Sequence, residues 1–158
     1  MAALREKDKD TYKKSIHITH FCEVISMKLG YDTDAIKTAG YYHVFGDRIR
    51  KIQREQKFPP EAVRILNEYL TVKKAARSGA LKSKETAILI CSEAVVNTVM
   101  QLIRQDPGKK YDFDKVITMI FKRFEDADYF SECNIPVRDL RIVENTFREG
   151  KLYYDFLR

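Results

Sequence analysis

The sequence of 158 residues has no tryptophan, three histidines and three cysteines. Because Cys22, Cys91 and Cys133 are odd in number and far apart, they argue against a disulfide framework and indicate a reducing compartment. Four prolines and six glycines leave room for long uninterrupted helices. No apolar run approaches the ~18–20 residues that cross a bilayer. The sequence therefore predicts a chain without a membrane span.

What is present is a globular composition, with 44% hydrophobic and 33% charged residues. The formal net charge of +6 makes an anionic partner plausible, whether a nucleotide, a nucleic acid or lipid headgroups. Two stretches concentrate the basic side chains, over residues 73–84 and 48–54. Neither stretch matches a nucleic-acid-binding motif, so solvated helix surfaces are favoured and nucleic-acid binding is not.

Apolar residues recur at helical spacing along nearly the whole chain, and alternating strand patterns are almost absent. This periodicity predicts an all-α fold, a single compact bundle of about six helices. A charged lead-in is assigned to residues 1–14 and the helical domain to residues 15–158. Helices are predicted from about residue 10 to 29, and over 33–45, 61–76, 83–105, 113–124 and 137–157, with partial helix in the charged stretch 47–58.

Residues 39–47, Ala-Gly-Tyr-Tyr-His-Val-Phe-Gly-Asp, carry the most information about function. They resemble the metal-binding signature of HD-domain phosphohydrolases, in which Tyr-His-Asp-Ile-Gly-Lys stands where this chain has residues 42–47. The segments that begin at Ser83 and at Arg123 resemble later blocks of the same family. The resemblance is greatest to the intracellular HD domain of bacterial seven-transmembrane HD receptors, which are cyclic di-AMP phosphodiesterases.

The resemblance implies a site for two divalent metals that hold phosphate oxygens and generate a hydroxide. His43 matches the signature histidine, whereas Val44 replaces the bridging aspartate and Asp47 the family's lysine. The family's first histidine falls on Lys14 and its later aspartate on Glu93. A further pair of family histidines falls near Tyr69 and Leu70, in the least certain part of the alignment.

No histidine follows position 43, so a two-metal centre of the family type cannot be assembled. No metal or other cofactor is therefore expected. The alternative is a single Mn, Fe or Zn ion held by His43, His17, Asp47 and Glu93, since two imidazoles with carboxylates form an acceptable ligand set. The simpler interpretation is that His43 is a packing and hydrogen-bonding residue in a relic pocket, and that His20 faces solvent.

These observations favour a catalytically degenerate HD domain that binds rather than hydrolyses. Its expected partner is a nucleotide such as a cyclic dinucleotide, held near His43, Arg48, Lys82 and Lys84, or another protein on the helical surface. The competing hypothesis is a metal-dependent phosphohydrolase with a rebuilt mononuclear site. The resemblance implies a bacterial signalling module in the cytoplasm, either free or as the cytoplasmic domain of a larger membrane protein.

Overall fold

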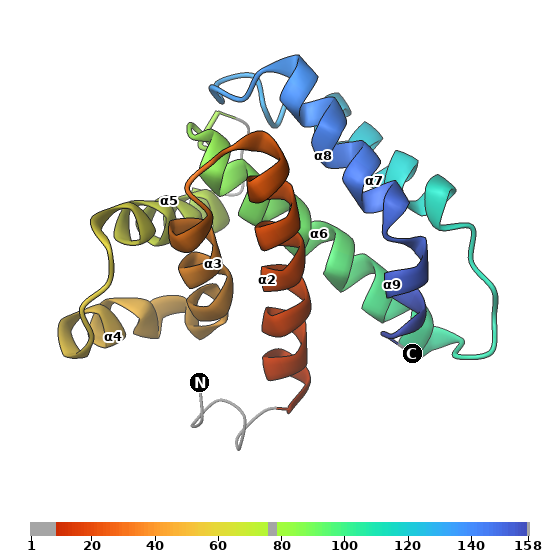
Figure 1. Ribbon diagram of the computed structural model, residues 1–158, viewed down its shortest axis with the longest axis horizontal. Coiled ribbons are helices and arrows are strands. Elements are labelled where there is room, and N and C mark those ends of the chain that lie inside the picture. Colours follow the sequence, from red (N-terminus) through yellow and green to blue (C-terminus); the bar gives the residue numbers. More distant parts are fainter. Residues whose placement is uncertain (1–8, 76–78, 158) are drawn as a thin grey trace.

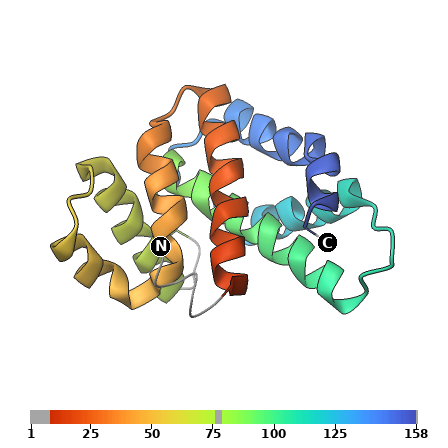
Figure 2. The same ribbon diagram turned by 60° about the horizontal axis from the view of Figure 1, so that its bottom comes forward.

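The computed structural model describes residues 9–75 and 79–157, and in these ranges the chain is helical with no strand. The all-α prediction is therefore confirmed. The first long helix, α2 (Lys9–Leu29), and the central helix, α6 (Lys84–Gln105), form the middle of the molecule (Figure 1). On one side of them lie α3, α4 and α5, and on the other side lie α7, α8 and α9, an arrangement that a second view also shows (Figure 2).

The first half of the chain forms α3 (Thr33–Tyr42), the 3-10 helix η1 (His43–Arg48), α4 (Ile49–Glu55) and α5 (Pro60–Ala75). Gly30, at φ 70°, ends α2 in the left-handed conformation that glycine adopts without steric cost. The Asp32 side chain then accepts a hydrogen bond from the Ala35 amide and caps α3. This tight turn sets α3 alongside α2.

Helix α6 is buried around most of its circumference through its first half, where every residue from Thr86 to Glu93 is buried. It starts at Ser83, whose hydroxyl accepts a hydrogen bond from the Thr86 amide. By length and composition this helix is apolar enough to cross a membrane, and 72% of its apolar window is buried inside the fold. Both properties also belong to a helix that forms the centre of a protein core.

The second half of the chain forms α7 (Phe113–Asp126), α8 (Val137–Glu149) and α9 (Lys151–Asp155). The prediction of one helix over residues 137–157 is wrong, because the chain turns at Gly150 between α8 and α9. The turn brings the buried Tyr154 hydroxyl back to donate a hydrogen bond to the Phe147 carbonyl oxygen at 2.6 Å. The ring of Phe21 on α2 packs against the rings of Phe147 and Tyr154.

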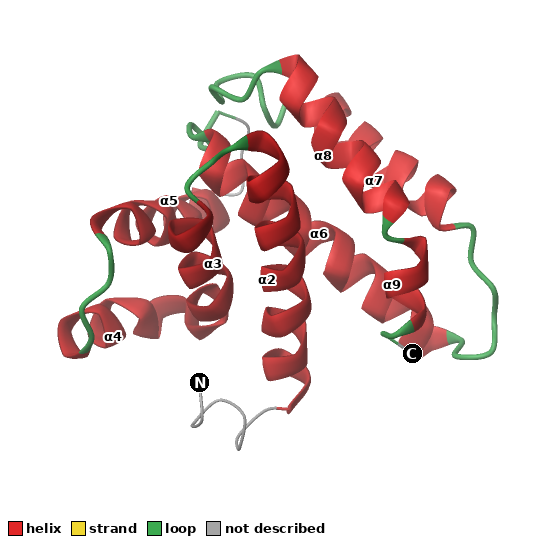
Figure 3. Ribbon diagram, in the orientation of Figure 1, coloured by secondary structure: helices red, strands yellow, loops and turns green. Residues whose placement is uncertain are grey.

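Smaller differences concern where the elements begin and end (Figure 3). The first helix starts at Lys9, so residues 9–14 of the expected lead-in are helical. The second α-helix ends at Tyr42 rather than Phe45, and η1 continues it past Gly46, which has φ 56°. Helix α7 extends two residues beyond the prediction, and the predicted end of the 61–76 helix lies outside the described residues.

Candidate functional site

A cleft of about 860 Å³ opens between α2, η1, α5 and α6. This volume lies within the range of small-molecule binding sites. Its lining is predominantly polar and charged, and His43 lies on it. The residues that line it are Thr11, Lys14, Ile18, His43, Val44, Gly46, Asp47, Arg50, Tyr69, Leu70, Thr71, Lys73, Lys74, Glu93 and Asn97.

His43 is held in one orientation by the end of α3. The carbonyl oxygen of Gly40 accepts a hydrogen bond from His43 Nδ1 at 2.7 Å. Because a carbonyl oxygen can only accept, the Nδ1 proton is present and the neutral ring has its lone pair on Nε2. Burial lowers the pKa of His43, although the Glu93 carboxylate opposes this effect. The buried imidazole is therefore neutral at neutral pH.

Glu93 is the buried carboxylate that His43 faces, with 3.6 Å between His43 Nε2 and Glu93 Oε2. Its donors are two residues of α5: the Tyr69 hydroxyl donates a hydrogen bond to Oε2, and the Lys73 ammonium forms an ion pair with Oε1. Burial, together with this carboxylate, raises the pKa of Tyr69. Tyr69 therefore stays protonated as a donor.

The charge of the cleft is positive. Four cationic side chains face two carboxylates around it: Lys14, Arg50, Lys73 and Lys74 against Asp47 and Glu93. Helices α2, α4 and α5 each contribute cations, so the positive charge surrounds the opening instead of following one helix. Such an arrangement attracts anions and disfavours a divalent metal ion.

Several of the residues selected from the sequence meet in this cleft. His43, Val44, Asp47, Glu93 and Lys14 all line it, as do Tyr69 and Leu70. Lys73 and Arg50 were not predicted individually as site residues. Both belong to the basic stretches that were interpreted as solvated helix surfaces, and the only signal for Lys73 was its i, i+4 spacing from Tyr69.

Other selected residues lie elsewhere. His17 does not line the cleft, whereas its neighbour Ile18 does. The His17 ring is directed to Tyr153, with 2.6 Å between His17 Nδ1 and the Tyr153 hydroxyl oxygen. His20 is exposed, as expected, and stacks on Tyr153. The Arg48 guanidinium lies over the Phe45 ring. Near the start of α6, the Lys84 ammonium lies over the Tyr31 ring, and the Lys82 carbonyl oxygen accepts a hydrogen bond from the Asn134 amide.

The residues present do not fit the metal centre that the resemblance implies. Val44 offers no ligand atom, and His17, one member of the alternative mononuclear set, is directed to Tyr153. Both oxygens of Glu93 already have partners. Within residues 9–75 and 79–157, no group of three histidine, cysteine or carboxylate side chains is arranged to hold a metal ion.

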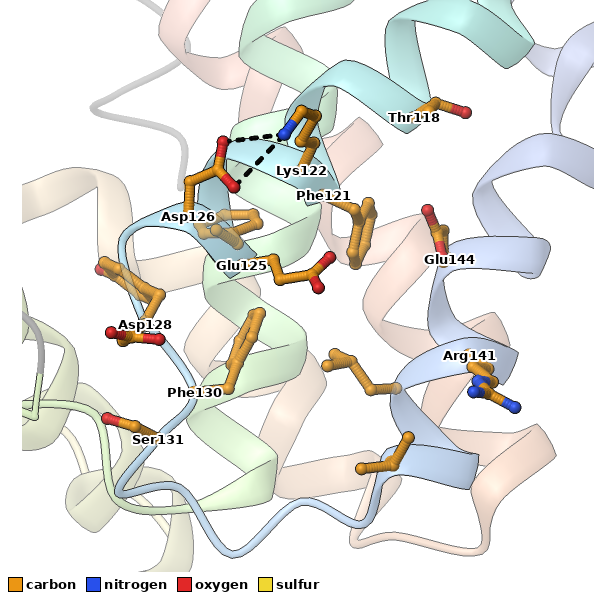
Figure 4. A pocket seen from close by; sticks show the side chains of 14 residues that line it. Thr118, Phe121, Lys122, Glu125, Asp126, Asp128, Phe130, Ser131, Arg141 and Glu144 are labelled. Atoms are coloured by element: carbon orange, nitrogen blue, oxygen red, sulfur yellow. Dashed lines mark hydrogen bonds and ion pairs between the residues drawn. The ribbon is translucent and has the colours of Figure 1, made fainter.

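A second hollow, of about 640 Å³, lies between α7, α8 and the segment that joins them (Figure 4). Phe121 and Phe130 point into it, and Glu125 and Asp128 lie at its rim. An ion pair between Lys122 and Asp126 borders it. This hollow contains none of the residues that match metal-binding positions of the HD resemblance.

The three histidines predict how stability depends on pH. Burial lowers the pKa of each histidine in the folded protein below its ordinary value. The unfolded chain therefore binds more protons near pH 6, so the stabilisation is complete above about pH 6.5 and is lost as the pH falls through the lowered pKa values. Urea unfolding at pH 7.5, 6.5 and 5.5 is expected to give a decreasing free energy of unfolding, by up to about 1.4 kcal/mol per pH unit for the buried His43 and by less for the more exposed His17 and His20, where solvent screens the charge. A constant or increasing free energy would contradict this assignment.

Two solved structures resemble this fold over nearly its whole length. The crystal structure of the L. monocytogenes phosphodiesterase PgpH HD domain has a TM-score of 0.68 at 17% identity, covering 95% of this chain and 96% of that chain. The same domain in complex with cyclic-di-AMP has a TM-score of 0.69 at 16% identity, covering 93% of each chain. No protein-family model and no curated protein sequence matches the chain significantly. The chain therefore has the HD-domain fold, as its sequence signature predicted.

Proposed function

We propose that this chain is a catalytically degenerate HD domain that binds a phosphate-bearing nucleotide, such as a cyclic dinucleotide, in the His43 cleft and does not hydrolyse it. The observation that carries the proposal is the cationic lining, in which Lys14, Arg50, Lys73 and Lys74 surround the centre where the family resemblance implies metals. Ammonium and guanidinium groups bind phosphate oxygens through charge-assisted hydrogen bonds.

Two further observations support binding without hydrolysis. Val44 removes the bridging carboxylate of the implied metal centre, and no other described residue takes its place. A solved HD domain of the same fold is bound to cyclic-di-AMP, so the scaffold accommodates a ligand of this size and charge. We infer a regulatory module of the cytoplasm.

Binding is tested by isothermal titration calorimetry with cyclic di-AMP in buffer containing EDTA. The wild type is expected to bind. Arg50→Met and Lys14→Met are each expected to weaken binding about 5- to 30-fold, since a hydrogen bond to a charged group contributes roughly 1–2 kcal/mol. Lys122→Met is the matched control, because it removes a cation from the other hollow and should leave the affinity unchanged. Unchanged affinity in a Lys14→Met, Arg50→Met double variant would reject this cleft as the site.

Hydrolysis is tested separately, by following cyclic di-AMP for a day with 1 mM MnCl₂. No linear product is expected. Turnover that depends on Mn²⁺ and disappears in His43→Ala would instead support the mononuclear phosphohydrolase.

Binding of nucleic acid is distinguished by its salt dependence. An affinity that falls steeply with salt concentration and does not depend on base identity indicates contact with a phosphate backbone.

A further inference from the structure

The Glu93 carboxylate has three neighbours, which come from two elements. Lys73 and Tyr69 reach it from α5, and His43 reaches it from η1. Lys73 follows Tyr69 by four residues, so both side chains project from one face of α5 toward α6. The Lys73 ammonium also lies over the Tyr69 ring, at 5.8 Å from its centroid. The carboxylate therefore has two donors in fixed positions, Lys73 and Tyr69, and the His43 ring as a close neighbour.

Only one of these three neighbours carries a positive charge at neutral pH. The Tyr69 hydroxyl is an uncharged donor, and His43 Nε2, 3.6 Å from Oε2, lies beyond hydrogen-bond distance. The Glu93 side chain is only 10% exposed, and a carboxylate removed from water to this extent requires a counter-charge. The Lys73 ammonium supplies it, and the half-exposed stem of Lys73 reaches in from the mouth of the cleft.

We propose that the Lys73 ammonium is a built-in replacement for a divalent cation, which neutralises Glu93 and keeps metal ions out of the cleft. The position supports this assignment, because His43 and Glu93 are the two residues that match metal-binding positions of the HD resemblance. A metal ion near Glu93 would meet the ammonium at short range and would lose Oε1 as a ligand. The inference extends the proposed function, since it gives a reason why this cleft would bind an anion without a metal.

The proposal predicts that removing the ammonium lets a metal ion bind weakly at Glu93. In Lys73→Met, Glu93 loses its counter-charge, and Glu93 Oε2 and the lone pair of His43 Nε2, which lie 3.6 Å apart, are left as two protein ligands whose remaining coordination positions water would fill. In EDTA the Tm of this variant is expected to fall by roughly 3–8 °C, and 1 mM MnCl₂ or ZnCl₂ is expected to restore at least about 2 °C of it. Equilibrium dialysis with elemental analysis is expected to find bound metal in the variant and little in the wild type.

The matched control is Lys74→Met, which makes the same chemical change at the next residue of the same cleft. No ion pair of Lys74 with Glu93 is present, so this variant is expected to behave as the wild type in both measurements. Equal metal binding by the wild type and Lys73→Met would overturn the proposal. A Lys73→Met variant that is indistinguishable from Lys74→Met would overturn it as well.

Two further variants keep the test decisive if Lys73→Met does not fold. Lys73→Gln retains a hydrogen-bond donor for Glu93 without the charge, and it is expected to gain metal binding; no gain there counts against the proposal. Lys73→Arg retains the charge and is expected to gain none. No nucleotide is present in these experiments, so the two proposals fail separately. If the wild type does not bind cyclic di-AMP, only the proposed function is rejected. If the Lys73 variants bind no more metal than the wild type, only the Lys73 assignment is rejected.

Discussion

Replacing Phe147 with alanine is expected to lower the free energy of unfolding by about 3–5 kcal/mol, a large share of the ~5–15 kcal/mol that holds a domain folded. Phe147 on α8 is fully buried, and its ring centroid lies 5.1 Å from that of Phe21 on α2 and 6.1 Å from that of Phe121 on α7. Removing the ring leaves a cavity where three helices meet. Urea unfolding at pH 7.5 measures the loss.

The control for Phe147 is Leu152→Ala on α9. Leu152 is 80% exposed, so its truncation creates no cavity and should change the free energy of unfolding by less than about 0.5 kcal/mol. Because Phe147 does not line the His43 cleft, the folded Phe147→Ala protein at low temperature is expected to keep the ligand affinity of the wild type. Equal losses in the two variants would show that the α2–α7–α8 junction does not carry the stability assigned to it.

Gly40→Val is expected to cost at least about 2 kcal/mol and to disturb the cleft as well. A Cβ atom at Gly40 would meet Thr19 Oγ1 at 2.7 Å and Thr19 Cα at 3.2 Å. The Thr19 side chain is not free to move aside, since its buried hydroxyl donates a hydrogen bond to the Ser15 carbonyl oxygen at 2.6 Å. Helix α3 must therefore move away from α2, and it carries His43 with it.

Urea unfolding gives the stability of Gly40→Val, and the nitrogen chemical shifts of the His43 imidazole report its hydrogen bond to the Gly40 carbonyl oxygen. The matched control is Gly108→Val, because a Cβ atom at Gly108 meets no atom within 4 Å and its backbone does not have positive φ. That substitution is expected to change neither observable. If Gly40→Val matches Gly108→Val in both measurements, the close approach of α2 and α3 does not position His43.

Most helices could be predicted from the sequence because their ends are fixed by local chemistry. Asp32 and Ser83 cap α3 and α6 with their own side chains, and Gly30 ends α2 within the same few residues. The break at Gly150 could not be predicted in this way. One glycine weakens a helix by only about 1 kcal/mol. Whether the helix breaks at Gly150 therefore depends on a tertiary contact, the hydrogen bond between the Tyr154 hydroxyl and the Phe147 carbonyl oxygen.

The candidate site was predictable only as far as side-chain direction follows from spacing. Lys14 and Ile18 are four residues apart and share one face of α2, whereas His17 falls on the neighbouring face and meets Tyr153. Lys73 lay within a basic stretch typical of a solvated surface. Its role depends on Glu93, 20 residues later in the sequence, and only the packing of α5 against α6 brings the two together.

The contacts of Phe21 with Phe147 and Tyr154 join α2 to α8 and α9. Synthesis on the ribosome proceeds from the amino terminus, so the aromatic face of α2 has no native cover until more than a hundred further residues have been added. The parts of the His43 cleft that lie in α2, η1, α4 and α5 are synthesised much earlier, and α6 completes the cleft. The two sides of the molecule thus become available for packing at different times during translation, and the cleft side comes first.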